Sequence, residues 1–230
     1  MRLPGLFVVG TDTDVGKTAV ATAIVRGFRA SGRRVGVYKP VASGIASVAD
    51  ERGDPWRLWD AAGRPLTVEQ VCPQWFAAAV APPAAARAES RIVDELLLRG
   101  GLAPWAAASD VVVVEGAGGL FSPVGDATLV ADLAREFAWP IVLVDAARLG
   151  AIGRTLATIH AARGEGLRIA AVVLSHVTEP ATDEGPASLA AIVRDAMAWI
   201  TSRTGVPVAV LDHGAALPSA GIDWLSLASG

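Results

Sequence analysis

The sequence of 230 residues contains one cysteine, three histidines and no long apolar run. The single Cys72 cannot form an intrachain disulfide or an all-cysteine metal site, which suits a reducing compartment. The histidines, His160, His176 and His213, stand in separate segments without metal-ligand spacing, and there is no G-x-S-x-G turn. Zinc chemistry and serine hydrolysis therefore have no support.

The chain also lacks an excess of positive charge. Its formal net charge is −3, and the basic residues are scattered, so no electrostatic footprint for nucleic acid is present. No stretch approaches the ~20 apolar residues of a membrane-spanning helix. No linker rich in Pro, Gly or Ser divides the sequence. We therefore expect one domain over residues 1–230, cytoplasmic, with no nucleic-acid or membrane partner.

The stretch Gly10–Thr18 is typical of a phosphate-binding loop. It follows the apolar run Leu6–Val9, a predicted buried strand, and precedes a predicted helix over 19–30. In such loops main-chain N–H groups surround an anion, the lysine (here Lys17) reaches terminal phosphate oxygens, and the threonine hydroxyl binds Mg²⁺. The first glycine stands one position too early for G-x-x-x-x-G-K-[ST]. A simple strand-to-helix turn with a solvated lysine is the alternative.

Three further apolar runs, at 35–38, 110–114 and 140–144, predict buried strands that each deliver a charged residue at the carboxyl end. These residues are Lys39, Glu115 and Asp145. Because ligands bind at the carboxyl ends of parallel strands, all three are expected on the rim that carries the phosphate loop. A carboxylate there can bind Mg²⁺, and Asp145 competes with Glu115 for that role.

The remaining pattern alternates strands with helices. Helices are predicted over 84–99, from the segment 148–155 onward, and over 186–204, with strands at 168–175 and 206–211. Short apolar strands separated by helices imply right-handed crossovers. The predicted fold is therefore α/β, with a mostly parallel, doubly wound sheet covered by helices on both faces.

Taken together, the motifs resemble those of the dethiobiotin synthetases, biotin-pathway enzymes that close a cyclic urea on 7,8-diaminopelargonate with CO₂ and ATP. Gly10–Thr18 matches the family's G-T-D-T-x-V-G-K-T, which explains the displaced glycine. Tyr38–Gly44 matches Y-K-P-V-A-S-G, and Val114–Pro123 matches V-E-G-A-G-G followed by an aromatic residue and a proline. The resemblance implies a P-loop sheet of about seven strands in a homodimer, with the site completed across the interface.

The resemblance also implies a set of nucleotide and metal contacts. The expected nucleotide contacts are Asp14, Val15, Gly16, Lys17, Thr18, Ala19, Asp54, Glu115, Gly116, Ala117, Gly118, Ser175 and His176. Mg²⁺ would be held by Thr18, Glu115 and a loop aspartate. That aspartate aligns best with Asp54, and Asp50 is the fallback.

For the substrate, the resemblance assigns the catalytic residues Lys17 and Lys39 to the phosphates and the carbamate, with Ser43 as a second carbamate contact. The partner subunit would bind the substrate carboxylate through a helix start. The residues expected there are Gly150, Ala151 and Ile152.

Three positions depart from the family. Gly153–Arg154 replaces asparagine-histidine after the helix start, Ser175–His176 stands where some relatives place an adenine-reading asparagine, and Ala81–Pro83 replaces S-P-H. The first affects recognition of the substrate tail and the second recognition of the base. Two other interpretations stay open: a different P-loop ATPase or amide-forming ligase, and a non-catalytic dimeric nucleotide binder.

Overall fold

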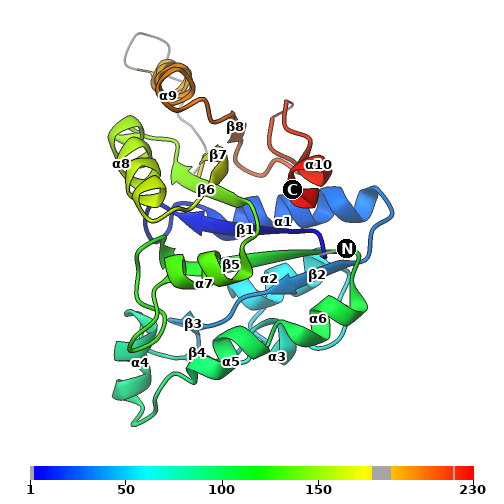
Figure 1. Ribbon diagram of the computed structural model, residues 1–230. Helices are drawn as coiled ribbons and strands as arrows, with labels where there is room; N and C mark the ends of the chain where they lie inside the picture. The colour runs from blue at the N-terminus through cyan, green and yellow to red at the C-terminus, as the bar shows by residue number, and fades with distance from the viewer. Residues whose placement is uncertain (1–2, 178–187, 220) are drawn as a thin grey trace.

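The computed structural model describes residues 3–177, 188–219 and 221–230. Among them, six strands form one parallel sheet in the order β2-β5-β1-β6-β7-β8 (Figure 1). Their bounds are β1 Gly5–Gly10, β2 Val35–Tyr38, β5 Val111–Gly119, β6 Ile141–Ala146, β7 Ile169–Ser175 and β8 Val208–Leu211. Two short strands, β3 (Ala42–Ser43) and β4 (Trp75–Phe76), pair separately.

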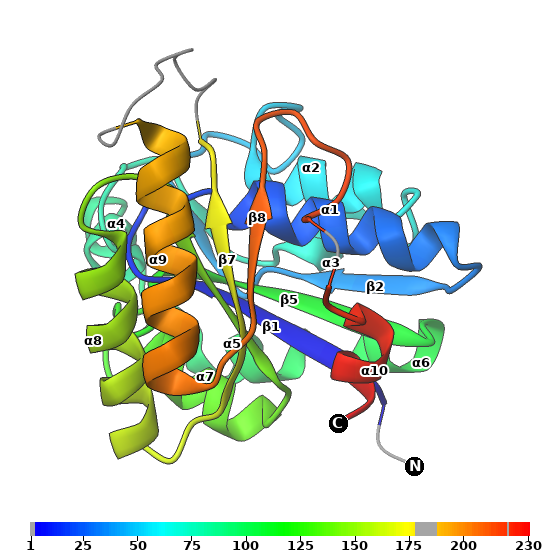
Figure 2. The same cartoon turned by 90° about the horizontal axis from the view of Figure 1, so that it is seen from above.

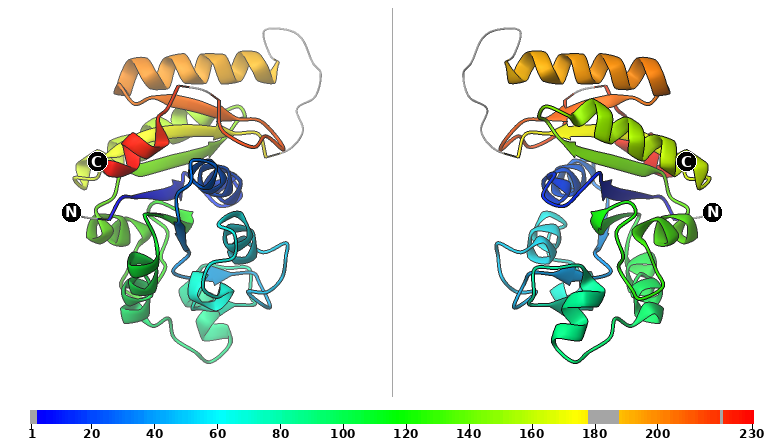
Figure 3. Two further views of the ribbon diagram at one scale, coloured as in Figure 1. Left: turned by 90° about the vertical axis from the view of Figure 1, so that its right-hand side faces the viewer. Right: turned by 90° about the vertical axis from the view of Figure 1, so that its left-hand side faces the viewer.

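Helices lie on both faces of the sheet, and Figure 2 shows α1 and α8 on opposite sides of it. Beyond one edge of the sheet lies α9, and the segment around α4 and α5 lies beyond the other (Figure 3). The helices are α1 Lys17–Ala30, α2 Asp54–Ala61, α3 Val68–Val71, α4 Pro82–Ala88, α5 Glu95–Gly100, α6 Ala103–Ala108, α7 Val130–Phe137, α8 Ala151–Gly164, α9 Leu189–Thr204 and α10 Trp224–Ser229.

The strands form where apolar residues run without interruption, because both faces of the sheet are covered. Every residue of β1, β6 and β7 is buried. Strand β5, which lies between β2 and β1, continues through Glu115 to Gly119, so the acid lies inside the strand and not just after it. The predicted α/β class, the parallel sheet and its covered faces are confirmed, with six strands in the main sheet.

One predicted helix is wrong. The segment 84–99 is divided into α4 and α5. Ser90 has φ 55°, a left-handed conformation that ends the first helix. The side chain of Asp94 then accepts hydrogen bonds from the main-chain N–H groups of Leu96 and Leu97, so it caps a new helix. The alanine-rich composition concealed both signals.

The last predicted helix and strand are each shorter than expected. Helix α9 begins at Leu189 after Ser188, whose hydroxyl accepts from the N–H of Ala191, and the first residues of the predicted helix lie outside the described residues. Strand β8 begins at Val208 instead of residue 206. Within the described ranges, no helix combines the length and apolar character that crossing a bilayer requires.

Candidate active site

The phosphate loop joins β1 to α1 through backbone conformations that favour glycine. Gly16 immediately precedes α1 and has φ 94°, and a Cβ at this position would lie 2.3 Å from Ser175 Oγ. Asp14 also has a positive φ, of 56°. The first main-chain N–H groups of α1 have no partner within the helix and so face the loop. This arrangement suits an anion.

Lys17 folds back across this loop. Its Nζ donates to the main-chain oxygen of Asp12 at 2.7 Å, and the side chain is buried. Burial and the neighbouring Lys39 lower the pKa of Lys17, whereas Glu115 and Asp54 oppose that shift. The amino group therefore lies inside the loop, where a phosphate oxygen can replace the Asp12 carbonyl as its hydrogen-bond acceptor.

A cluster of charges lies beside it, in which Lys39 and Glu115 are buried and the Asp54 side chain is partly exposed. We call Thr18, Lys39, Asp54 and Glu115 the Lys39 cluster. Lys39 Nζ lies 2.5 Å from Glu115 Oε1 and 2.9 Å from Asp54 Oδ2. The Thr18 hydroxyl donates to Glu115 Oε1 at 2.9 Å. These residues come from α1, the end of β2, the start of α2 and β5. The fold thus joins four distant segments at one point.

The pKa values in the cluster reflect this pairing. Burial works against the charged form of Lys39, but the carboxylates of Asp54 and Glu115 outweigh it and raise the pKa of Lys39. Burial also works against the charged form of Asp54, yet Lys39 lowers the pKa of Asp54 to about 2. Burial raises the pKa of Glu115, and Lys39 only partly offsets this. Lys39 is therefore held as a cation between two acids.

The Lys39 cluster has the donors that a hard divalent cation prefers. Glu115 Oε2 is fully buried and has no hydrogen-bond partner, so one carboxylate oxygen remains available. The Thr18 hydroxyl and the Asp54 carboxylate supply further oxygens. In the described part of the chain, no group of three or more His, Cys, Asp or Glu side chains could hold a metal ion by itself. A cation here would need oxygens from a nucleotide or water as well.

The two fallback acids are placed differently. Asp50 is bonded to Arg52 through the main-chain N–H and the guanidinium, outside the cluster. Asp145 is fully buried, and both of its oxygens already accept hydrogen bonds. Of the four acids considered for the metal, the structure brings Asp54 and Glu115 to Lys39 and leaves the other two elsewhere.

A cavity of about 900 Å³ opens over the loop and the Lys39 cluster. At the end nearer Lys39 it is lined by Ser43 and by the turn that includes Ala81 and Pro82. A second part is lined by Ser175, His176, Val177 and the segment Leu211–Ala215. Its volume and the range of segments that line it suit a ligand larger than a phosphate, with an anionic part on the loop. The first part is called the phosphate end below and the second the base end.

Ten of the thirteen expected nucleotide contacts line this cavity, among them Asp14, Gly16, Thr18 and Ala19 of the loop and the first turn of α1. In contrast, Val15 is 1% exposed and packs in the core. On β5, Ala117 and Gly118 line the cavity, whereas Gly116 is buried against Val130. Gly118 has φ 73°, and a Cβ there would lie 2.6 Å from Ser122 Oγ, so this turn requires glycine.

At the base end, His176 has one unsatisfied nitrogen. Its Nε2 lies 3.7 Å from Asp212 Oδ1, while Nδ1 is buried without a hydrogen-bond partner. The Asp212 side chain is 79% exposed. The polar groups at this end are therefore fewer and less firmly held than those of the Lys39 cluster.

The predicted carboxylate-binding residues lie outside this cavity. Gly150 precedes α8 with φ 90°, and Ala151 and Ile152 form the first turn of the helix. None of the three lines the cavity of its own chain. Leu149 is 80% exposed and Gly150 is also exposed, whereas Ala151 is buried, so only the turn before the helix is open to solvent.

A family model described as an AAA domain matches residues 4–213. The ATP-dependent dethiobiotin synthetase BioD of Rhodopirellula baltica is 44% identical over 190 residues, which cover 77% of this chain and 74% of that relative. The protein of the same name from Anaeromyxobacter dehalogenans is 44% identical over 191 residues, with 83% and 84% covered. The chain belongs to the dethiobiotin synthetase family.

Solved structures of more distant proteins share the fold. Chloroplast FtsY of Physcomitrella patens has a TM-score of 0.51 at 16% identity, and the match covers 100% of this chain and 65% of FtsY. The signal recognition particle receptor FtsY of Elizabethkingia anophelis has a TM-score of 0.56 at 14% identity, again with 100% and 65% covered. At these identities the likeness shows the P-loop fold alone.

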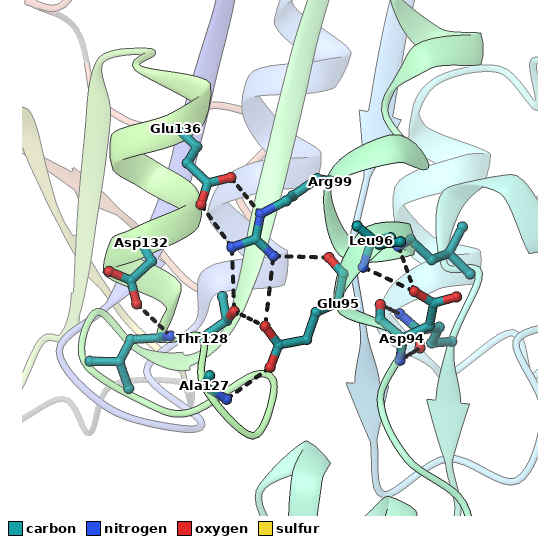
Figure 4. Close-up of polar contacts among 11 residues, drawn as sticks. Asp94, Glu95, Leu96, Arg99, Ala127, Thr128, Asp132 and Glu136 are labelled. Carbon is teal, nitrogen blue, oxygen red and sulfur yellow. Dashed lines mark hydrogen bonds and ion pairs between the residues drawn. The ribbon is translucent and has the colours of Figure 1, made fainter.

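One set of side-chain contacts in this dethiobiotin synthetase, between α5 and the loop that follows β5, could not be predicted from the sequence. Figure 4 shows Arg99 of α5 bonded to the carboxylate of Glu136 at 2.6 and 2.7 Å. Glu95 of the same helix accepts from the Thr128 hydroxyl at 2.6 Å and from the Ala127 N–H at 2.8 Å. These bonds hold the loop from β5 to α7, whose Ser122 lines the cavity. The only signal for these bonds in the sequence is the i, i+4 spacing of Glu95 and Arg99, which places both side chains on one side of a helix.

Proposed function

We propose that the protein catalyses the ATP- and Mg²⁺-dependent carboxylation and ring closure of 7,8-diaminopelargonate with CO₂, which gives dethiobiotin for biotin biosynthesis. The observation that carries this proposal is the Lys39 cluster. A second lysine, Lys17, lies close to it in the phosphate loop. Two cations and metal-binding oxygens at one point suit a reaction in which two anions must meet.

Mg²⁺ would be held by Thr18, Asp54 and Glu115. The unpartnered Glu115 Oε2 and the Thr18 hydroxyl support this assignment. When bound, the ion would neutralise phosphate charge and orient the terminal phosphate. Both carboxylates now contact Lys39, so a metal that shared them would leave the lysine freer to bind a second anion.

The first chemical step joins the carbamate to the terminal phosphate. The lone pair of one substrate amine attacks CO₂ and the nitrogen loses a proton to water, which gives an anionic carbamate that Lys39 and Ser43 would bind. A carbamate oxygen then attacks the γ-phosphorus of ATP, the bond to the leaving ADP oxygen breaks, and a carbamic–phosphoric anhydride forms. Lys17 and Lys39 offset the repulsion between the two anions and stabilise the charge that develops.

The second step closes the ring. The other amine attacks the carbonyl carbon of the anhydride and phosphate departs with the bonding electron pair, while the nitrogen loses a proton to phosphate or water. Both reacting groups belong to one bound molecule, so closure is intramolecular. Such an arrangement can supply about 7–11 kcal/mol relative to a bimolecular reaction.

The substrate tail requires a second subunit in this proposal. Gly150, Ala151 and Ile152 do not line their own cavity, and they form the N-terminus of a 14-residue helix, which favours a carboxylate. We therefore propose a homodimer in which each α8 start binds the substrate carboxylate of the partner's site. We further propose that the chain works in the cytoplasm as a single domain.

The decisive experiment incubates the protein with ATP, Mg²⁺, bicarbonate and 7,8-diaminopelargonate. We expect dethiobiotin by mass spectrometry and release of one phosphate for each product molecule formed. Omission of the diamine should abolish both. Phosphate release that ignores the diamine would instead indicate a different P-loop ATPase.

A further inference from the structure

Asp145 is a buried acid that the proposed reaction leaves without a role. It is the next-to-last residue of β6, is fully buried and does not line the cavity. Its Oδ1 accepts from the Thr11 hydroxyl at 2.7 Å, from Arg154 Nε at 3.1 Å and from the N–H of Ala146 at 2.8 Å. Its Oδ2 accepts from the Thr155 hydroxyl at 3.2 Å. A buried carboxylate with this many partners is held in a single orientation.

Arg154 connects this acid to the beginning of α8. Besides Asp145, its guanidinium donates to the main-chain oxygens of Leu149 and Ala146, each at 3.4 Å. It also lies across Gly150, where a Cβ would be 2.9 Å from Nη1. The side chain therefore covers the turn between β6 and α8, yet it does not line the cavity.

Thr11 connects the same acid to the phosphate loop, of which it is the second residue. Its main-chain N–H donates to the oxygen of Val144 at 2.9 Å. On the other side, the oxygen of Gly10 accepts from the N–H of Leu120 at 2.9 Å. The hydrogen bond from the Thr11 hydroxyl to Asp145 therefore joins the loop directly to this acid.

We propose that Asp145 and Arg154 are positioning residues for the phosphate loop. Arg154 holds Asp145, Asp145 holds Thr11, and Thr11 fixes the start of the loop whose N–H groups surround the phosphates. A side chain outside the cavity thereby controls nucleotide affinity, and the loop and the start of α8 are fixed relative to each other. This inference rests on the proposed nucleotide site but not on the carboxylation.

The expected effect follows from geometry. Loss of the Arg154 guanidinium leaves the buried carboxylate with fewer partners, so it can reorient and release Thr11. Because displacement of a binding group by about 1 Å can cost up to ~10²-fold, nucleotide binding should weaken about tenfold. Thr11→Val keeps the size of the side chain, removes only the hydroxyl and should weaken binding a few-fold.

The test is calorimetric titration of the whole protein with Mg²⁺ and a non-hydrolysable ATP analogue. It compares wild type with Arg154→Ala, Thr11→Val and the double variant. Both changes act through Asp145, so the double variant should bind less weakly than the product of the two single effects predicts. Arg163→Ala is the matched control, because Arg163 is on the same helix and bonds to the Thr204 oxygen at 2.6 Å. It should bind like wild type.

A structural role alone would lower the melting temperature of Arg154→Ala without changing its Kd, and a Kd within twofold of wild type would overturn the proposal. If Arg154→Ala does not fold, Arg154→Lys replaces it. Lysine keeps the charge but not the fork that reaches both carbonyls, and its Kd should lie between wild type and the tenfold loss. Wild-type affinity in both Arg154→Lys and Thr11→Val would also overturn the proposal. The titration omits the diamine, so absence of carboxylase activity would not affect it.

Discussion

The phosphate end and the base end of the cavity differ in how densely their polar groups are bonded. At the phosphate end, Lys39 Nζ lies within 2.9 Å of two carboxylates, one of which also accepts from Thr18. At the base end, His176 has one nitrogen 3.7 Å from an exposed aspartate and another with no partner. The polar groups of the phosphate end are therefore held in place by one another without a ligand, whereas those of the base end are not.

This difference indicates where affinity and selectivity come from. The triphosphate and Mg²⁺ are identical in all nucleotides, so a dense phosphate end gives binding energy without telling one base from another. Discrimination needs donors and acceptors fixed at the base end. Substitutions at the phosphate end should therefore change turnover, and the groups at the base end should decide the preference among nucleotides.

Removal of either lysine should have the largest effect. Lys17→Ala and Lys39→Ala should each reduce turnover by ~10² or more, because each removes a preorganised charge at the reacting phosphate. Steady-state release of phosphate and dethiobiotin measures this. The exposed Arg168→Ala, which removes one positive charge outside the cavity, is the control. Turnover at the wild-type level in Lys39→Ala would remove the basis for its assigned role.

Substitution of the two buried acids, Glu115 and Asp145, should affect the dependence of the rate on Mg²⁺ differently. Glu115→Gln should raise the Mg²⁺ concentration needed for half-maximal rate by about tenfold or more, since one charged ligand becomes a neutral one. Asp145→Asn is the matched change in an acid whose oxygens are already occupied; with ATP saturating, so that its effect on nucleotide affinity does not enter, it should shift the Mg²⁺ requirement far less. Titration of the rate with Mg²⁺ distinguishes the two variants. The reverse order would make Asp145 the ligand.

The base end should tolerate other nucleotides. Ser175 and His176 stand where an asparagine could pair with adenine through a donor and an acceptor together. Loss of such a bidentate contact gives up ~1–3 kcal/mol of discrimination, by analogy with base readout elsewhere. We expect kcat/KM for CTP or GTP within about tenfold of that for ATP, or about 1.4 kcal/mol. A preference for ATP of about a hundredfold or more would show that other groups, such as Leu211–His213, read adenine.

The smallest effect is expected from the α5 contacts that hold the β5–α7 loop. Arg99→Ala should lower stability by about 1 kcal/mol, because the Arg99–Glu136 pair is partly exposed. For a chain of this size, that corresponds to a melting temperature lower by about 2–4 °C. Activity should fall modestly while the ratio of CTP to ATP use stays unchanged, since the loop borders the phosphate end. A changed ratio would contradict the division between the two ends.

The local sequence pattern was sufficient to predict those parts of the fold that are determined by residues close together in the chain. The loop at 10–18, the strand that ends just before Lys39, the apolar strand that carries Glu115 and the crossover helices follow from apolar runs and glycine placement. The helix predicted at 84–99 failed because a single left-handed residue, Ser90, and a capping Asp94 outweighed the composition.

Contacts between distant segments could not be predicted in the same way. The pairing of Lys39 with Asp54 depends on the path of the loop between them, which spacing does not fix. Arg154 was recognised only as a departure from relatives, because its bond to Asp145 crosses a tight turn. Which side chains come into contact across a turn depends on the backbone geometry of that turn, and the conformational preferences of single residues do not determine it.

The placement of the lysines has a consequence for chemical labelling. Among the 20 basic residues counted as Lys and Arg, Lys17 and Lys39 are the only lysines in the sequence, and both lie in the cavity. Their pKa values move in opposite directions, since burial lowers that of Lys17 whereas two acids raise that of Lys39. The Lys17 amine is therefore the better nucleophile. An amine-selective acylating reagent should mark Lys17 before Lys39 and, apart from the chain terminus, nothing else, so one such label would report directly on occupancy of the phosphate loop.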